Sequence, residues 1–128
     1  MSILDIRTGL DLCEISRIER LINETRFLDK YFSENERIYF AAHGNRAESI
    51  AAAFSAKEAF SKALGTGVSN FSLCEVEVLH NDAGKPYFNF LGRAAEIVKA
   101  NNFTFDVSLT HTETTAAAVV ICQREEKA

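Results

Sequence analysis

The chain has 128 residues, which is enough for one domain with its own hydrophobic core. Its hydrophobic content of 47% and charged content of 25% are ordinary for a globular protein. Its net charge of −4 argues against general nucleic-acid affinity. No apolar run approaches the ~20 residues of a membrane helix, and the acid-bearing start is not a signal peptide. We therefore expect a single domain over residues 1–128, with neither nucleic acid nor membrane as a partner.

The cysteines indicate the compartment. Cys13, Cys74 and Cys122 are an odd number and include no Cys-x-x-Cys pair. We therefore expect neither a disulfide framework nor a zinc site. We expect a cytoplasmic location, which is a reducing environment. No His or other base is adjacent to any of the three, so nucleophilic catalysis by a thiol has no support.

The first third of the chain predicts one strand and a run of short helices. Loose alternation predicts the strand, with Asp11 at or near its end. Ser33 and Glu36 have the spacing of a capping box, in which both side chains satisfy free backbone N–H groups at the start of a helix. The predicted ranges are 3–11 for the strand and 14–22, 27–32 and 33–42 for the helices.

The last third predicts a hairpin, a helix and two strands. The final strand is almost continuously apolar, as expected for the middle of a sheet. The predicted ranges are strands 74–80 and 86–90 around a turn at 81–85, a helix over 92–102, strands 103–109 and 115–122, and a solvated tail over 124–128. The order is strand, three helices, β-hairpin, helix and two strands, which predicts an α+β domain.

The central helix, from Arg46 to Leu64, organises the rest of the prediction. It is apolar almost all round, which is typical of a helix that is buried on most sides. Gly65 fits the left-handed position that ends many helices. Glu58 lies in the middle of this helix, and a buried carboxylate is costly unless it is paired or bound to a cation. Glu58 therefore needs a partner.

Asp11 is the candidate partner of Glu58. Two hard oxygen ligands with open positions suit Mg²⁺, which completes its octahedron with water and substrate phosphates. Taken on spacing alone, the two residues are more simply interpreted as two unrelated acids. Lys57 and Lys62 flank Glu58 and are either a cationic rim for phosphate oxygens or solvated charges, with Lys62 an i,i+4 partner of Glu58.

Three other features have weaker support. The Gly65-Thr66-Gly67 segment follows a helix C-terminus, where the helix dipole repels anions, so it favours a cap and turn over a phosphate loop. His111 lies just after a predicted strand and is either a satisfied surface histidine or a ligand contact. His43 and His80 have no partner at metal spacing and are interpreted as structural.

Four motifs resemble those of one family. They are Gly9-Leu10-Asp11, the stretch from Phe54-Ser55-Ala56-Lys57-Glu58 to Gly65-Thr66-Gly67, Gly84-Lys85-Pro86, and Ser108-Leu109-Thr110-His111-Thr112. In order and spacing they resemble the holo-acyl-carrier-protein synthases, the small class of 4′-phosphopantetheinyl transferases. The resemblance runs from the first strand to the last. It implies the 4′-phosphopantetheinyl transferase-like fold.

The resemblance also implies a reaction and a set of roles. These enzymes move phosphopantetheine from coenzyme A to a serine of apo acyl carrier protein and release adenosine 3′,5′-bisphosphate. The resemblance also implies a homotrimer with active sites between subunits, as expected for family members of this size. Such an assembly would account for a central helix that is apolar all round. By this resemblance, Asp11 and Glu58 would bind Mg²⁺ and act in catalysis, and the phosphates of coenzyme A would be bound by Lys57, Lys62 and His111. The nucleotide pocket would be lined by Gly65, Gly67, Lys85 and Pro86. The acidic carrier protein would be bound by Arg17, Arg20 and Arg26.

Two points leave alternatives open. The family commonly has Arg immediately before the Phe of the central motif, and this chain has Ala53, so one contact to coenzyme A is absent or comes from another residue. A non-catalytic module that binds coenzyme A or a nucleotide is the alternative function, and the Asp11–Glu58 pair counts against it. Arg17, taken without the family, is better interpreted as a solvent-facing partner of Glu14 or Glu24.

Overall fold

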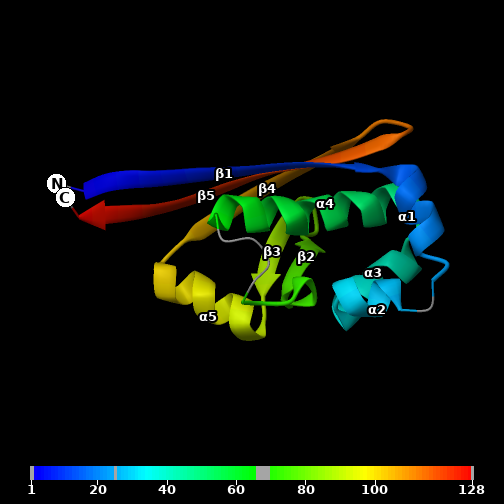
Figure 1. Cartoon of the computed structure of the whole chain (residues 1–128), viewed down its shortest axis with the longest axis horizontal. Coiled ribbons are helices and arrows are strands. Elements are labelled where there is room, and N and C mark those ends of the chain that lie inside the picture. Colours follow the sequence, from blue (N-terminus) through cyan, green and yellow to red (C-terminus); the bar gives the residue numbers. More distant parts are fainter. Residues whose placement is uncertain (1, 25, 66–69, 128) are drawn as a thin grey trace.

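The computed structural model describes residues 2–24, 26–65 and 70–127 (Figure 1). No helix in these ranges is long and apolar enough to cross a membrane. The strands are β1 (Ser2–Glu14), β2 (Val76–His80), β3 (Pro86–Phe90), β4 (Thr104–His111) and β5 (Thr115–Lys127). The helices are α1 (Ile15–Leu21), α2 (Phe27–Tyr31), α3 (Glu34–Ala42), α4 (Ala47–Leu64) and α5 (Gly92–Asn101), with a short 3₁₀ turn, η1 (Leu73–Glu75).

The α+β class and most element types are confirmed, with three differences. Within the described residues four α-helices precede the hairpin, which agrees with the four predicted helical ranges and is one more than the three named in the predicted order. Cys74 lies in η1, so the first hairpin strand begins at Val76. The solvated tail is wrong for residues 124–127, because β5 continues to Lys127 and pairs with the start of β1. Arg124 is held there by ion pairs to Asp5 and Glu126.

One three-stranded antiparallel sheet, in the order β1-β5-β4, carries the longest strands. The β1–β5 ladder runs from Ser2 opposite Lys127 to Glu14 opposite Thr115, so the two termini lie side by side (Figure 1). The apolar strand β5 is in the middle, as its composition predicts.

Helix α4 lies between this sheet and the β2–β3 hairpin (Figure 1). Thirteen of its residues are buried, which confirms that it is covered on most sides. The cover comes from the chain itself, so burial of α4 does not require neighbouring subunits. Its N-cap is Arg46, and Gly65 ends it in the left-handed conformation with φ 81°.

The sheet presents two different faces because successive side chains of a strand alternate. On the face toward α4, the strands place small or apolar buried residues, including Gly9, Cys13, Ala116, Ala118 and Val120. On the opposite face, β1 exposes a row of large apolar side chains. They are Leu4, Ile6, Leu10 and Leu12, beside Val119 and Ile121 of β5.

Candidate functional site

Glu58 and Asp11 come together because β1 lies unusually close to α4. A side-chain carbon at Gly9 would be 1.8 Å from the carbonyl oxygen of Ala59, so only glycine permits this approach. Asp11 follows two residues after Gly9 on the same face of β1, and Glu58 immediately precedes Ala59. The contact between strand and helix therefore sets the separation of the two carboxylates.

Lys62 lies at the same place, one helical turn after Glu58. Its Nζ donates hydrogen bonds to the carbonyl oxygen of Leu10 at 2.9 Å and to Oδ1 of Asp11 at 3.2 Å. The Lys62 side chain is 57% exposed, while that of Asp11 is 17% exposed. One ammonium group is thus fixed beside the carboxylate pair and still faces solvent.

The electrostatics of Glu58 show that the two carboxylates interact. Burial raises the pKa of Glu58, and the negative charge of Asp11 raises this pKa further. The positive charges of Lys62 and Arg17 lower the pKa of Glu58 and do not reverse the net upward shift. A cation placed between Asp11 and Glu58 would relieve this repulsion.

The donor set fits Mg²⁺. Within the described ranges, no cluster of three or more His, Cys, Asp or Glu side chains could hold a metal. Mg²⁺ does not need such a cluster, because it is usually bound by one or two carboxylates together with water and substrate phosphates. Two carboxylates that repel each other beside a solvent-facing lysine meet this requirement.

Lys57 does not lie at this site, and its predicted contact with phosphate is contradicted. Its side chain is fully buried, and all three donors of Nζ are used inside the protein. They bind Oε1 of Glu36 at 2.7 Å and the carbonyl oxygens of Leu73 at 2.9 Å and Val76 at 2.7 Å. Adjacent helix residues point about 100° apart, so Lys57 faces away from the side on which Glu58 meets Asp11.

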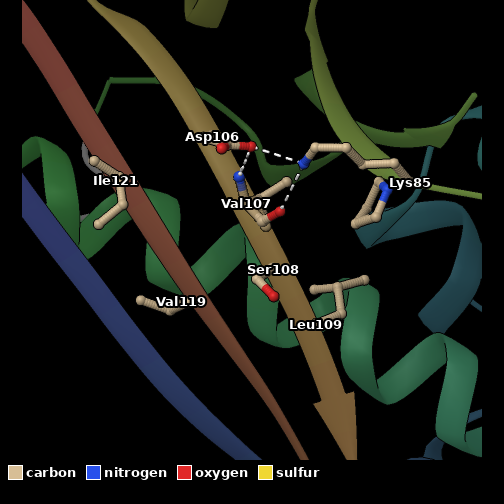
Figure 2. Close-up of a pocket in the computed structure, with 8 residues that line it drawn as sticks. Lys85, Asp106, Val107, Ser108, Leu109, Val119 and Ile121 are labelled. Atoms are coloured by element: carbon tan, nitrogen blue, oxygen red, sulfur yellow. Dashed lines mark hydrogen bonds and ion pairs between the residues drawn. The ribbon is translucent and has the colours of Figure 1, made fainter.

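Lys85 and Pro86 line a pocket of about 370 Å³ at the edge of the sheet (Figure 2). Asp106 and Ser108 of β4 also line it, together with Val119 and Ile121 of β5. The Nζ of Lys85 donates a hydrogen bond to Oδ1 of Asp106 at 2.8 Å, and this ion pair lowers the pKa of Asp106. Asp106 could not be identified from the sequence as the partner of Lys85. The Gly84-Lys85-Pro86 motif contains no acid, and Asp106 lies 21 residues after Lys85, in β4.

His111 is the last residue of β4 rather than the residue after the strand. It lines a different pocket, of about 160 Å³, with Tyr39, Glu48 and His80 among its other residues. The rings of Tyr39 and His80 are stacked at 4.4 Å. The structure therefore does not bring His111 into the pocket of Lys85. Gly65 caps α4, while Gly67 lies outside the described residues.

Arg17 and Arg26 share a third pocket, of about 280 Å³, between α1, α2 and α4. The guanidinium of Arg17 lies 5.7 Å from the centre of the Phe54 ring, and no ion pair to Glu14 or Glu24 forms within the described part of the chain. Lys30 also lines this pocket and was not singled out from the sequence. Arg20 is exposed in the last turn of α1 and does not line it.

Comparison with known proteins identifies the family. Residues 7–120 match the sequence profile of the 4′-phosphopantetheinyl transferase superfamily. The chain belongs to this superfamily. A holo-[acyl-carrier-protein] synthase of Fusobacterium nucleatum subsp. nucleatum is 41% identical over 118 residues, which cover 91% of this chain and 97% of that relative.

Solved structures of the superfamily share the fold. A holo-[acyl-carrier-protein] synthase from Neisseria meningitidis matches with a TM-score of 0.85 and 27% identity over 92% of this chain and 98% of that chain. The Helicobacter pylori synthase in complex with coenzyme A matches with a TM-score of 0.80 and 27% identity over 90% and 98% of the two chains. The resemblance drawn from the four motifs is confirmed.

The raised pKa of Glu58 predicts a pH-dependent effect of its replacement. A carboxyl whose pKa is higher in the folded state contributes most favourably at low pH, and stability is lost as the pH rises past its ordinary value. Glu58→Gln removes this loss. In urea unfolding with a chelator present, the variant should be more stable than the original protein at pH 7 and should approach it below about pH 4.

Glu125→Gln, at an exposed position of β5, is the control and should leave the pH dependence unchanged. A Glu58→Gln variant that is less stable than the original protein at pH 7 would show that the Glu58 carboxylate is favourably placed without a cation.

Proposed function

We propose that this chain transfers 4′-phosphopantetheine from coenzyme A to a serine of apo acyl carrier protein, in the reducing cytoplasm that its three free thiols favour. The reaction uses Mg²⁺ and releases adenosine 3′,5′-bisphosphate. The observation that carries the proposal is the convergence of Asp11 and Glu58 beside Lys62. The relatives named holo-[acyl-carrier-protein] synthase, and a similar structure described as a coenzyme A complex, support the choice of substrates.

The protein supplies position and charge for this reaction. Phosphoryl transfer needs reacting oxygens placed in line and negative charge neutralised, with little covalent chemistry from the enzyme. Asp11 and Glu58 would hold Mg²⁺, which when bound withdraws charge from the diphosphate. Lys62 is already fixed by Leu10 and Asp11, so its ammonium can meet a phosphate oxygen without first losing its conformational freedom.

The bond changes define what else the site must do. The serine oxygen attacks the phosphorus that bears pantetheine, and the bond from that phosphorus to the bridging oxygen breaks. Adenosine 3′,5′-bisphosphate leaves with the bridging oxygen and the electron pair. The serine proton passes to Glu58 or to a water at the site.

Loss of either carboxylate should remove most of the activity. We expect Asp11→Asn and Glu58→Gln each to lower kcat/KM by about 10²–10⁴, because each removes one of the two carboxylate ligands that would hold Mg²⁺ on the diphosphate. The measurement is the mass of apo carrier protein after incubation with coenzyme A and Mg²⁺, which increases by one phosphopantetheine group. Asp82→Asn, in the exposed hairpin turn, is the control with the same chemical change.

Full activity of both variants at saturating Mg²⁺ would refute the carboxylate pair. The alternative function, a non-catalytic module that binds coenzyme A or a nucleotide, predicts binding of coenzyme A and no mass change of the carrier. The absence of Arg at position 53 favours that alternative slightly, since Ala53 is buried and offers no charge.

The carrier surface is proposed at the pocket of Arg17, Arg26 and Lys30. An acidic carrier is repelled by a chain of net charge −4, so it must bind at a local basic patch. These three cations line the pocket together with one acid, Glu24, and with apolar residues that include Phe27 and Phe54. Arg20 would contribute from the neighbouring exposed surface of α1.

Reversing the charge of Arg17 tests this surface. Arg17→Glu should slow carrier association about tenfold at low salt and flatten its salt dependence, because long-range steering by the patch is lost. Arg93→Glu makes the same change of net charge on exposed α5 and is the control. Stopped-flow measurement should show a lower association rate for Arg17→Glu than for Arg93→Glu. An unchanged rate for Arg17→Glu would show that Arg17 is not part of the carrier interface.

We also propose a homotrimer assembled through the outer face of the sheet. Monomeric proteins rarely expose a large continuous apolar patch, and large patches mark interaction sites. Leu4, Ile6, Leu10 and Leu12 on β1 are each 54–68% exposed in the single chain. Pairing this face with other copies would also bring the pocket of Lys85, which Val119 and Ile121 line, against a neighbouring subunit.

Sedimentation equilibrium tests the assembly. The original protein should have the mass of three chains, and Ile6→Asp should have the mass of one, because the substitution places a charge in the apolar face. Ile38→Asp is the control, because Ile38 is 60% exposed on α3 and away from the sheet. A single-chain mass for the original protein, or dissociation caused by Ile38→Asp, would contradict the proposal.

A further inference from the structure

The buried ammonium of Lys57 joins parts of the fold that are distant in sequence. It links α4 to Glu36 in the first turn of α3, to η1 through Leu73 and to β2 through Val76. The Glu36 carboxylate in turn accepts hydrogen bonds from the backbone N–H of Val78 at 3.0 Å and of Ser33 at 3.0 Å. Lys57 and Glu36 are both fully buried, and the charge of each is compensated by the other.

On the opposite side, α4 meets β1 through the close approach of Ala59 to Gly9 and through two hydrogen bonds from Lys62, to Leu10 and Asp11. Helix packing is set by side chains that interdigitate as ridges and grooves, and small side chains make shallow ridges. The face of the sheet that contacts α4 includes Gly9, Cys13, Ala116 and Ala118. On this side of α4 the buried small residues include Ala52, Ala59 and Ala63. The hydrogen bonds of Lys57 add directional contacts on the other side of the helix, so that rotation or sliding of α4 is opposed from both sides.

We infer that Lys57 is a positioning residue, which together with the β1 contacts fixes the register and rotation of α4 and so helps to hold Glu58 at the separation from Asp11 that a shared divalent cation requires. This role rests on the proposed function for its consequence in catalysis. It replaces the phosphate contact that the motif suggested for Lys57. A shift of one residue along a helix moves a side chain by about 1.5 Å and turns it by about 100°, so a small slip of α4 would remove Glu58 from the site.

An ion pair of this kind is better suited to setting position than to adding stability. Taking two charges out of water costs several kcal/mol per ion in general, and their attraction only roughly repays that cost. Removing one partner leaves a buried, unpaired charge, whereas neutralising both removes the penalty. Stability and register can therefore be separated by experiment.

The experiment compares Lys57→Met with the double variant Lys57→Met/Glu36→Gln. Lys57→Met should unfold at a lower temperature because the Glu36 charge is unpaired. It should also raise the Mg²⁺ concentration for half-maximal transfer about tenfold, with KM for the carrier unchanged. The double variant should regain part of the melting temperature, because the amide introduced at position 36 is neutral. This amide keeps one acceptor oxygen, so only one of the backbone N–H groups of Ser33 and Val78 retains its partner. The Mg²⁺ requirement of the double variant should remain raised.

The matched control is Glu77→Gln. Glu77 is also fully buried, but it binds Ser33, Asn35 and Asn89 and no residue of α4. This variant should lose melting temperature and keep its Mg²⁺ requirement within about twofold. If the double variant regains the Mg²⁺ requirement together with its stability, or Glu77→Gln shifts that requirement equally, Lys57 is only structural.

A second readout does not depend on transfer. Free Mn²⁺, measured by electron paramagnetic resonance during titration of each variant with coenzyme A present, gives the affinity of the site for a divalent cation. The Lys57 variants should bind Mn²⁺ about tenfold more weakly than the original protein. Absence of transfer by the original protein, with this difference in Mn²⁺ affinity intact, would refute the proposed function and retain the positioning role. Equal Mn²⁺ affinity in all variants would refute the positioning role.

Discussion

The structure depends on the close approach of β1 to α4 at Gly9. A strand and a helix normally keep their backbones apart because side chains fill the space between them. Here one partner has no side chain, and the carbonyl oxygen of Ala59 occupies the position where a Cβ would be. The approach brings two acids that are far apart in sequence to one place, and it surrounds Glu58 with enough protein to raise its pKa. The glycine of the Gly-Leu-Asp motif is thus as much a part of the site as the aspartate.

The two sides of α4 are held by different interactions, close packing on one side and a buried ion pair on the other. The side toward β1 and β5 is made of small residues and permits the close approach, while the side toward α3 and β2 carries the Lys57–Glu36 pair. A helix with both properties has little freedom to turn or slide. This division explains why adjacent residues of one motif, Lys57 and Glu58, have opposite environments. The lysine is sealed in the interior, and the glutamate faces a partly open site.

The sequence predicted what depends on neighbours along the chain and missed what depends on distant ones. The capping box at Ser33 and the left-handed end of α4 at Gly65 follow from local chemistry, and both were predicted correctly. The partner of Lys57 lies 21 residues away, so no spacing rule could reveal it. Residues 124–127 were interpreted as a tail because they are polar. Their role depends on β1, which supplies Asp5 to Arg124 and the opposite half of the ladder.

Strand β1 would link function to assembly if the proposed trimer forms through the outer face of the sheet. Its residues toward the protein interior include the charged Asp5, Arg7 and Asp11, whereas its outward residues are Leu4, Ile6, Leu10 and Leu12, the reverse of a strand that covers a core from solvent. The inward charges are accounted for by ion pairs and by the carboxylate site. No element within the described part of the chain covers the outward apolar row. Because Leu10 and Asp11 are adjacent on one rigid strand, any partner that covers the outer face also fixes the backbone that presents Asp11 to Glu58. Assembly would thereby stabilise the geometry of the site.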